Sequence, residues 1–354
     1  MVESKVKIGV IGAGWWAVEN HIPVLKSRPD VHLAGVCRPG KGELDRIQQR
    51  FEIDYGTGDY QKMVDGLDLD GVVVSSPHHL HYKHARAALE KGISVLCEKP
   101  MTLRTKHARE LVDLVKRKGL HFLIPYGWNY EDFALDAKSQ IDSGAIGSIR
   151  HLTCQMAGTT FELFSGMEPW FVKESFVKPE PSTWSDARRG GGYGHGQTTH
   201  LLGLLLWITG LEPAQVYAEM GLSVTQADLF HALSARFTNG ATATISGSAG
   251  VPKHLGYQID VRVFGTDGML LLDLESGRER LEVRRHEQKD YVRQMTTGEG
   301  TYACVKPLYR FVDLIQGKPV DNRSPVELGA RVVELLDAAY RSAQSGRPES
   351  VPAR

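Results

Sequence analysis

The sequence predicts an α/β domain with a doubly wound parallel sheet, followed by a second domain of strands and helices. Short apolar runs alternate with helical stretches up to residue 125, which is typical of parallel strands joined by crossover helices. A glycine-rich turn follows the first apolar run. From residue 149 several strand candidates follow, and two of the turns between them look like hairpin connections. We therefore expect two domains, at 1–125 and 126–354.

The composition is that of a globular protein without a charged surplus. The 354 residues include 42 Lys and Arg and 42 Asp and Glu, so the formal net charge is +0 and nothing favours nucleic acid or an anionic membrane as partner. The start, MVESKVK, leads directly into a strand, so we expect neither a signal peptide nor a membrane span. The four cysteines are scattered without C-x-x-C spacing, which predicts reduced thiols and a cytoplasmic location. They are Cys37, Cys97, Cys154 and Cys304.

The first strand candidate, at 6–11, ends in a glycine turn. The segment GAGWWA at 12–17 fits the G-x-G-x-x-G/A fingerprint of dinucleotide-binding Rossmann domains. Its first glycine permits a tight turn, and the second lets the backbone approach a pyrophosphate. The following helix points N–H groups and its positive dipole end at that anion. We assign cofactor contacts to Gly12, Ala13, Gly14, Trp15 and Trp16.

The rest of the first domain continues the alternation. Helices are expected at 17–28, 41–51, 82–91 and 104–118, and strands at 31–37, 71–75, 93–97 and 120–125. Ligands of a doubly wound sheet bind at the carboxyl ends of its strands. The segments SPHHLH and CEKP follow two of these strands, so both are expected near the cofactor.

Arg38 follows the second strand, where a dinucleotide fold normally has an acidic residue for the ribose hydroxyls. A carboxylate would repel a 2′-phosphate, whereas a guanidinium binds one in bidentate fashion. The cofactor is therefore NAD or NADP, and Arg38 favours NADP or the use of both. Stacking of Arg38 on the adenine, or simple solvation, is the alternative.

Four histidines, at 78, 79, 81 and 84, lie close together in the sequence. No Cys or carboxylate completes a recognisable ligand spacing, so we expect no metal site. Cofactor contact or a solvated loop accounts for the cluster more simply. We assign cofactor contacts here to Ser76, Pro77, His78 and His81.

The tripeptide Glu98-Lys99-Pro100 is the most informative in the chain. A lysine at the end of a strand that opens onto the cofactor can have its pKa lowered by burial and by a nicotinamide cation, which suits it to proton transfer. Pro100 fixes the following turn and Glu98 can position the loop. An exposed Lys-Pro turn is the alternative.

The chain resembles the Gfo/Idh/MocA-type oxidoreductases, named for glucose-fructose oxidoreductase, inositol dehydrogenase and a rhizopine-catabolism protein. The resemblance rests on GVIGAG, on SSPHHLH in the S/T-P-x-x-x-H place, on CEKPMT in the EKP place, and on a later GGG-to-His segment. It implies that Lys99 lies beside the nicotinamide and the substrate, with Glu98 among the cofactor contacts. It also implies a C-terminal open, mainly antiparallel sheet with helices on one face, whose other face serves a homodimer or homotetramer.

The GGG-to-His segment leads from a glycine loop into the apolar helix LLGLLLWITG. In the family it reads approximately GGG-x-x-x-D-x-G-x-H, and the final histidine is catalytic. His200 matches that histidine, but Gly196 stands where the family has aspartate. The usual Lys-Asp-His relay cannot be assumed, and Tyr193, His195 or Gln197 are candidates for the missing polar contact. A purely structural histidine is the alternative for His200.

The segment Trp128-Asn129-Tyr130 stands where family members often have an Asn-Arg-Phe-like stretch. Tyr130 in place of the common arginine implies a different substrate wall, and Asn129 is assigned to the cofactor. Trp128 either stacks on a sugar or packs in the core. Lys173, Lys178, Arg188 and Arg189 form either a solvated loop or a basic pocket for an anionic substrate group.

The second domain is expected to contain a helix at 131–143, then strands, then two helices at 307–315 and 326–342, and a mobile tail at 345–354. Strand candidates lie at 149–156, 216–220, 232–237, 241–247, 258–264, 269–273 and 281–285.

The function expected from the resemblance is hydride transfer between nicotinamide and a secondary alcohol of a sugar, glycoside or cyclitol. Lys99 exchanges the hydroxyl proton, and His200 orients the hydroxyl or acts as base. Two alternatives stay open. One is an NAD(P)-dependent glycosidase that oxidises a sugar carbon transiently. The other is a nucleotide-binding regulator that has lost the chemistry.

Overall fold

The computed structural model describes residues 5–353, in two compact units. The first unit comprises Met1–Gly127, Pro169–Thr183 and Cys304–Ala330, and the second comprises Trp128–Glu168, Trp184–Ala303 and Arg331–Arg354. Part of the start on which the expectation of no signal peptide rests, residues 1–4, lies outside the described residues. Two segments from the later part of the sequence thus belong to the first unit.

The sheet of the first unit has six strands in the order β3-β2-β1-β4-β5-β6, and neighbouring strands pair in parallel. The strand order reverses between β1 and β4, and ligands of such sheets bind at the carboxyl ends beside that point. The predicted doubly wound parallel sheet is therefore confirmed. The strands are β1 Val6–Ile11, β2 Val31–Cys37, β3 Gly56–Thr57, β4 Gly71–Val74, β5 Ser94–Cys97 and β6 Phe122–Leu123.

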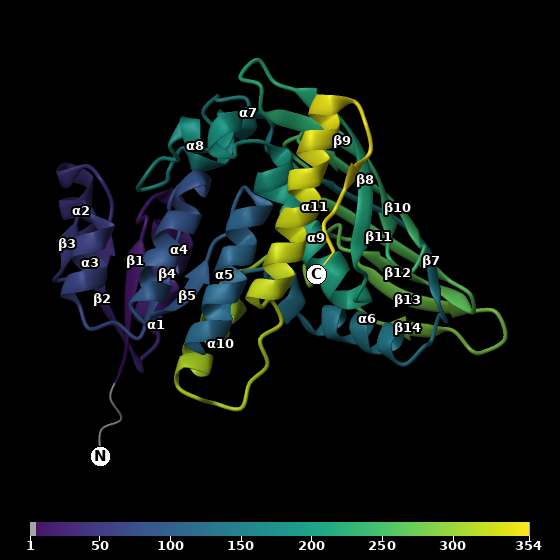
Figure 1. Cartoon of the computed structure of the whole chain (residues 1–354), viewed down its shortest axis with the longest axis horizontal. Coiled ribbons are helices and arrows are strands. Elements are labelled where there is room, and N and C mark those ends of the chain that lie inside the picture. The colour runs from purple at the N-terminus through teal and green to yellow at the C-terminus, as the bar shows by residue number, and fades with distance from the viewer. Residues whose placement is uncertain (1–4, 354) are drawn as a thin grey trace. The chain divides into compact units, whose positions relative to one another are not determined.

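Helices connect and cover these strands (Figure 1). They are α1 Ile22–Ser27, α2 Lys41–Phe51, α3 Tyr60–Gly66, α4 His81–Glu90, α5 Thr105–Lys118 and, from the later segment, α10 Val305–Ile315. Strands β4 and β5 are buried throughout, as parallel strands between helix layers are. Helix α10 is tied to the end of α1 by Arg28, whose Nη2 lies 2.9 Å from Asp313 Oδ1.

The sheet of the second unit has nine strands in the order β14-β13-β12-β11-β7-β10-β9-β8-β15. Neighbouring strands pair antiparallel except β7 and β10, which are parallel, so the expected mainly antiparallel sheet is confirmed. The longer strands are β7 Ile149–Ala157, β8 Pro213–Leu222, β9 Asp228–Phe237, β10 Thr242–Ser248, β11 Gln258–Gly265, β12 Gly268–Asp273 and β13 Arg280–Arg285. The short ones are β14 Tyr291–Arg293 and β15 Glu349–Ser350.

Helices cover one face of this sheet. Along β9 the side chains alternate between buried and exposed, which is the pattern of a strand with one solvated face. Helix α9 Thr199–Thr209 is almost entirely buried and contacts α6 Asp132–Asp142. The C-terminal half of α11 Val326–Ser345 lies along the strands, where Ser342 Oγ accepts the Ala218 N–H at 3.0 Å. A short helix, α7 Phe161–Phe164, follows β7, and another, α8 Pro181–Ser185, begins in the segment that belongs to the first unit.

The predicted mobility of the tail is wrong over its described part, up to residue 353. Strand β15 pairs antiparallel with β8, and the buried Val351 donates its N–H to the Ala214 carbonyl at 2.9 Å. Because β8 has an unused edge on that side, the tail gains backbone hydrogen bonds there as well as apolar contact.

The structure also bears on the cysteines and on the expectation of no membrane span. All four cysteines are buried free thiols. Among residues 5–353, no helix is both long enough and apolar enough to cross a bilayer.

Candidate active site

The glycine turn after β1 is built for close approach of backbone to backbone. Gly12 has a φ of +94°, and a Cβ placed on it would lie 2.3 Å from the backbone nitrogen of Ser76. Only glycine fits there. The N–H groups of Gly12 and Ala13 donate to the Cys37 carbonyl at 2.8 and 3.0 Å, which ties the turn to the end of β2. A Cβ on Gly14 would meet no described atom within 4 Å.

The helix after this turn starts with Trp15 and contains a π-turn at Ala17–His21. The Val18 N–H donates to the Gly14 carbonyl at 3.0 Å, so Trp15 and Trp16 lie at the amino end, where an anion binds in this kind of fold. The ring of Trp15 packs 5.9 Å from the ring of Phe171, which comes from the segment Pro169–Thr183 of the same unit.

Glu98 lies at the end of β5 and is buried. Its Oε1 accepts hydrogen bonds from Trp16 Nε1 and His21 Nε2, each at 2.8 Å, and its Oε2 accepts the backbone N–H of Lys99 at 3.1 Å. Burial alone would raise the pKa of Glu98, but the bonds from His21 and Trp16 and the charge of Lys99 hold that pKa below its usual value. Glu98 is therefore a buried carboxylate with its charge retained.

Lys99 is buried, with 7% of its surface exposed. Burial lowers the pKa of Lys99 to about 8, because desolvation of the ammonium outweighs the attraction of the Glu98 carboxylate. The amine therefore changes charge close to physiological pH, which is what a general base or acid needs. The Lys99–Pro100 peptide bond is cis.

His81 joins the two loops that follow β4 and β5. Its Nε2 lies 2.7 Å from the Ser76 carbonyl and its Nδ1 lies 2.7 Å from the Pro100 carbonyl. Burial lowers the pKa of His81 and lowers that of His84 to about 4. His84 Nδ1 is 2.9 Å from Ser76 Oγ. Within residues 5–353, no group of three or more His, Cys, Asp or Glu side chains forms a candidate metal site.

Arg38 lies beside the glycine turn. Its Nη1 donates to the Ala13 carbonyl at 3.2 Å, and its Nη2 forms an ion pair with Glu43 of α2. Its Nε donates to the Pro39 carbonyl at 3.2 Å. The guanidinium is thus at the expected end of β2, but a carboxylate that the sequence did not single out accompanies it.

In the second unit, His200 stands at the start of α9, directly after a second π-turn at Gly194–Thr198. It is 5% exposed and lies edge-on to two aromatic rings, with centroid distances of 5.9 Å to Trp128 and 4.5 Å to Tyr302. Trp128 is itself buried, and its Nε1 donates to the Gly300 carbonyl at 2.9 Å. Tyr302 had no sequence signal, because it lies in an irregular segment about 100 residues from His200 along the chain.

An aromatic ring occupies the space beside Gly196. A Cβ placed on Gly196 would lie 2.4 Å from Cζ of the buried Phe164. The side chain of Phe164 therefore fills the space that the expected aspartate would need.

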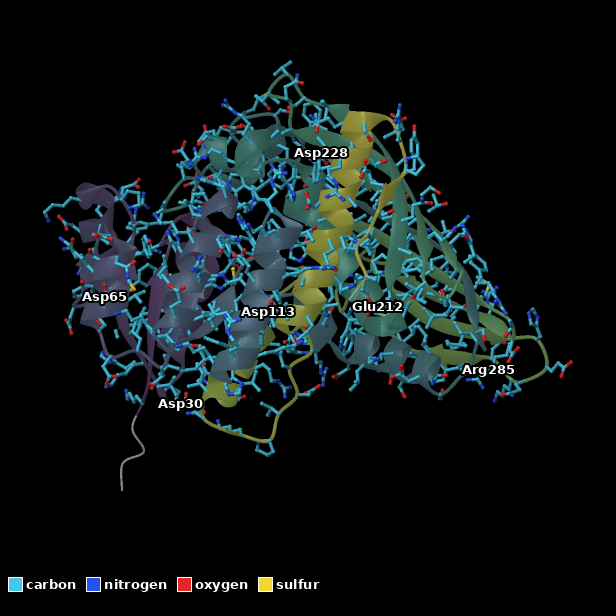
Figure 2. All side chains as sticks on the ribbon, viewed as in Figure 1. Asp30, Asp65, Asp113, Glu212, Asp228 and Arg285 are labelled. Carbon is cyan, nitrogen blue, oxygen red and sulfur yellow. The ribbon has the colours of Figure 1, made fainter. Side chains whose placement is uncertain are left out.

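A buried carboxylate on β9, Asp228, holds the glycine loop instead (Figure 2). It accepts the Gly194 N–H at 2.8 Å and the Tyr340 hydroxyl at 2.7 Å, and its Oδ2 lies 3.4 Å from His231 Nδ1. His231 Nε2 lies 2.9 Å from Thr198 Oγ1, which completes a chain to the end of the π-turn. Burial would raise the pKa of Asp228, but these partners lower it below its usual value.

The remaining predicted residues lie as follows. Ser76 and His78 are buried near His81, and Pro77 directly precedes the 3₁₀ turn His78–Leu80. Asn129 donates to the Gly203 carbonyl at 3.4 Å, and Tyr130 is buried. Tyr193 donates to the Met156 carbonyl at 3.1 Å, His195 stacks on Tyr340, and Gln197 bonds to Tyr257. Lys173 is exposed, and the exposed Arg188 pairs with Asp186.

Two family models match the chain. Residues 6–126 match the model of an oxidoreductase family with an NAD-binding Rossmann fold, and residues 134–271 match the GFO/IDH/MocA C-terminal domain. The chain belongs to the GFO/IDH/MocA oxidoreductase family. The sequence-based resemblance to this family is therefore confirmed, and so are the NAD-binding domain and the fold of both parts.

Members of the GFO/IDH/MocA family with assigned activities resemble the chain over part of its length. The D-glucoside 3-dehydrogenase of Escherichia coli (strain K12) is 31% identical over 152 residues, which are 42% of this chain and 42% of that protein. The 2,7-anhydro-N-acetylneuraminate hydratase of Mediterraneibacter gnavus is 27% identical over 157 residues, 44% of this chain and 40% of that protein. The matched stretch is thus less than half the length of each relative.

Solved structures of this fold match over the full length. GenD2 from gentamicin A biosynthesis, solved in complex with NAD, has a TM-score of 0.78 at 23% identity and covers 100% of this chain and 98% of its own. At this level of identity the likeness establishes the fold.

Proposed function

We propose that the protein is a nicotinamide-dependent oxidoreductase that acts on a secondary hydroxyl of a sugar, glycoside or cyclitol. The observation that carries this proposal is Lys99, a buried lysine with a pKa of about 8 at the carboxyl end of a strand in an NAD-binding domain. The similarity to a glucoside dehydrogenase supports a carbohydrate substrate.

In the proposed reaction, Lys99 in its neutral form takes the proton of the substrate hydroxyl, and the resulting ammonium then stabilises the oxygen as its negative charge develops. When bound, the nicotinamide cofactor supplies the hydride acceptor for the carbon. We assign to His200 the orientation of the hydroxyl or the role of base, and its ring lies edge-on to Trp128 and Tyr302. The hydroxyl proton thus leaves on Lys99.

We also keep NAD(P)-dependent glycoside cleavage as a second candidate. In it a sugar carbon is oxidised, the neighbouring C–H is acidified, the aglycone is eliminated, water adds, and the carbon is reduced again. Two observations favour it. Phe164 fills the place of the family's aspartate, and one relative is a hydratase of an anhydro sugar. An anionic substrate group, for which the exposed Lys173 or the exposed Arg188 is a candidate partner, would fit this candidate.

Three finer assignments belong to the same proposal. Arg38 beside the glycine turn supports use of NADP as well as NAD. The chain assembles as a homodimer or homotetramer through the exposed face of the nine-stranded sheet. The free thiols support a cytoplasmic location.

The experiment is a panel of sugars, glycosides and cyclitols with NAD and with NADP, monitored for NAD(P)H and for released aglycone together. Stoichiometric NAD(P)H supports the dehydrogenase, and aglycone release without net NAD(P)H supports the glycosidase. Lys99→Ala should abolish either activity, whereas the exposed Lys106→Ala should retain it. Cofactor binding without turnover on any substrate would instead support the regulator.

A further inference from the structure

Both carboxylate oxygens of Glu98 accept hydrogen bonds, one from the helix after the glycine turn and one from the backbone of Lys99. Oε1 accepts Trp16 Nε1 and His21 Nε2 from the helix that starts at the glycine turn, and Oε2 accepts the backbone N–H of Lys99. Because Glu98 is buried, these bonds lie in a medium of low polarity and restrict the carboxylate strongly. One side chain therefore links the turn expected to hold the pyrophosphate to the lysine expected to move the proton.

The π-turn makes this double contact possible. Residues five apart on a regular α-helix point about 140° away from each other, so Trp16 and His21 would not meet one acceptor atom. At Ala17–His21 the chain instead forms a hydrogen bond from the Ile22 N–H to the Ala17 carbonyl, five residues back. The wider turn brings Trp16 and His21 to the same face.

His21 contacts the Glu98 carboxylate through Nε2, at 2.8 Å. It is fully buried, and within residues 5–353 its Nδ1 has no hydrogen-bond partner. A proton on Nδ1 would be a buried donor without an acceptor, which costs free energy. The tautomer with the proton on Nε2 satisfies the contact with Glu98, so the carboxylate keeps its full negative charge toward Lys99.

We infer that Glu98, fixed by Trp16 and His21, is a positioning residue that couples occupation of the dinucleotide turn to the charge of Lys99. Coupling of this kind is reciprocal, because a ligand that favours one charge state of Lys99 binds more tightly in that state. The inference rests on the proposed function only in taking Lys99 to lie beside the nicotinamide.

Ionisable groups that act on Lys99 include Glu98, Cys304 and His81. The Glu98 carboxylate supports the ammonium form of Lys99, and burial raises the pKa of the Cys304 thiol to about 12, so that thiol stays neutral. Burial lowers the pKa of His81, while its bonds to the Pro100 and Ser76 carbonyls act in the opposite direction. Glu98 therefore raises the pKa of Lys99 against the larger, lowering effect of burial.

The test is the affinity for NAD⁺ measured by calorimetry between pH 6 and 10. In the native protein the affinity should rise several-fold around pH 8, since Lys99 then loses the charge that repels the nicotinamide cation. Lys99→Met should remove this dependence. Glu98→Gln should shift the midpoint at least one pH unit lower, whereas the exposed Glu90→Gln should leave it unchanged.

The His21 variants supply an independent measurement if Glu98→Gln does not fold. His21→Leu removes a donor from the carboxylate, which then attracts the ammonium more strongly, so the midpoint should rise. His21→Gln retains an N–H donor and should stay nearer the native midpoint. An unchanged midpoint in Glu98→Gln, equal midpoints in the two His21 variants, or a flat native profile would each overturn the inference. This pH profile in a protein that turns over no substrate would contradict the proposed function alone.

Discussion

Phe164 and Gly196 are in direct contact, with a Cβ on Gly196 leaving only 2.4 Å to Cζ of the phenylalanine ring. The two positions therefore form one packing unit, in which the absence of a side chain at one makes room for a large ring at the other.

Gly196→Asp alone should destabilise the protein by about 2 kcal/mol or more, because the new side chain overpacks a buried site and carries a charge. Phe164→Ala combined with Gly196→Asp should recover part of this loss. Urea denaturation of the single and double variants measures the coupling. Phe161→Ala on the same helix, at an exposed position, is the control and should cost little. Strictly additive effects would contradict the contact.

Lys99→Met should lower turnover by about 100-fold or more while cofactor binding persists, because general acid-base catalysis is lost. It should also change the pH dependence of stability. The folded-state pKa of Lys99 is lowered to about 8 from 10.5, so the unfolded chain binds more protons between these values and stability rises with pH across that window. At pH 7 the variant should be more stable than the native protein by up to about 3 kcal/mol.

Denaturation of both proteins at pH 7 and pH 10 checks this sign. The advantage of Lys99→Met should shrink at the higher pH, and an advantage that does not change with pH would show that Lys99 is charged without penalty in the folded state.

Glu43→Gln should raise the affinity for NADP relative to NAD by about tenfold, roughly 1.4 kcal/mol, because the ion pair with Arg38 then no longer competes with a 2′-phosphate. Titration with both cofactors measures the ratio. Asp45 lies on the same helix and pairs with Lys41, so Asp45→Asn is the matched control. If the affinity ratio of NADP to NAD is unchanged in Glu43→Gln, the 2′-phosphate of NADP does not bind at Arg38.

Asp228→Ala should destabilise the second unit by about 3 kcal/mol, since it leaves the buried Gly194 N–H and Tyr340 hydroxyl without their acceptor. Tyr340→Phe, which removes one of these bonds, should cost only about 1 kcal/mol. The pKa of Asp228 is lowered in the folded state, so its contribution is present above the unfolded pKa and is lost as pH falls through the folded one. Acid denaturation of native protein and Asp228→Asn should therefore converge at low pH.

The elements of the fold follow from local patterns, and most were predictable. The helix at 41–51 has the predicted limits, and the strand predicted at 258–264 ends one residue later, at Gly265, because amphipathic and alternating patterns act over neighbouring residues. The tail was mispredicted, since its pairing with β8 depends on a distant strand edge. The same holds for Pro169–Thr183, which contacts the first unit through Phe176 N–H and Glu19 Oε1 at 3.1 Å.

Candidate site residues could be predicted from the sequence where they belong to a local motif. Residues that join the site only through tertiary packing could not be predicted. Lys99 and His200 stand out because their flanking residues fix a loop and a helix start. Asp228, Tyr302 and Phe164 lie in ordinary strand, loop and helix sequence, so only the folded chain brings them to the glycine loop and to His200. Glu43 had no sequence signal, because α2 carries a second acidic residue, Asp45, which only pairs with Lys41 on the same helix.

The pairing of β15 with β8 also bears on edge-to-edge association between molecules. An uncovered edge of ten residues would offer a neighbouring molecule a ready template for strand addition. Two residues of β15 and the Val351 N–H occupy part of that edge, and the opposite edge ends in the three-residue β14 with two arginine-linked ion pairs at Arg293. Shortening the chain before Glu349 would therefore promote aggregation even where the remaining fold is intact.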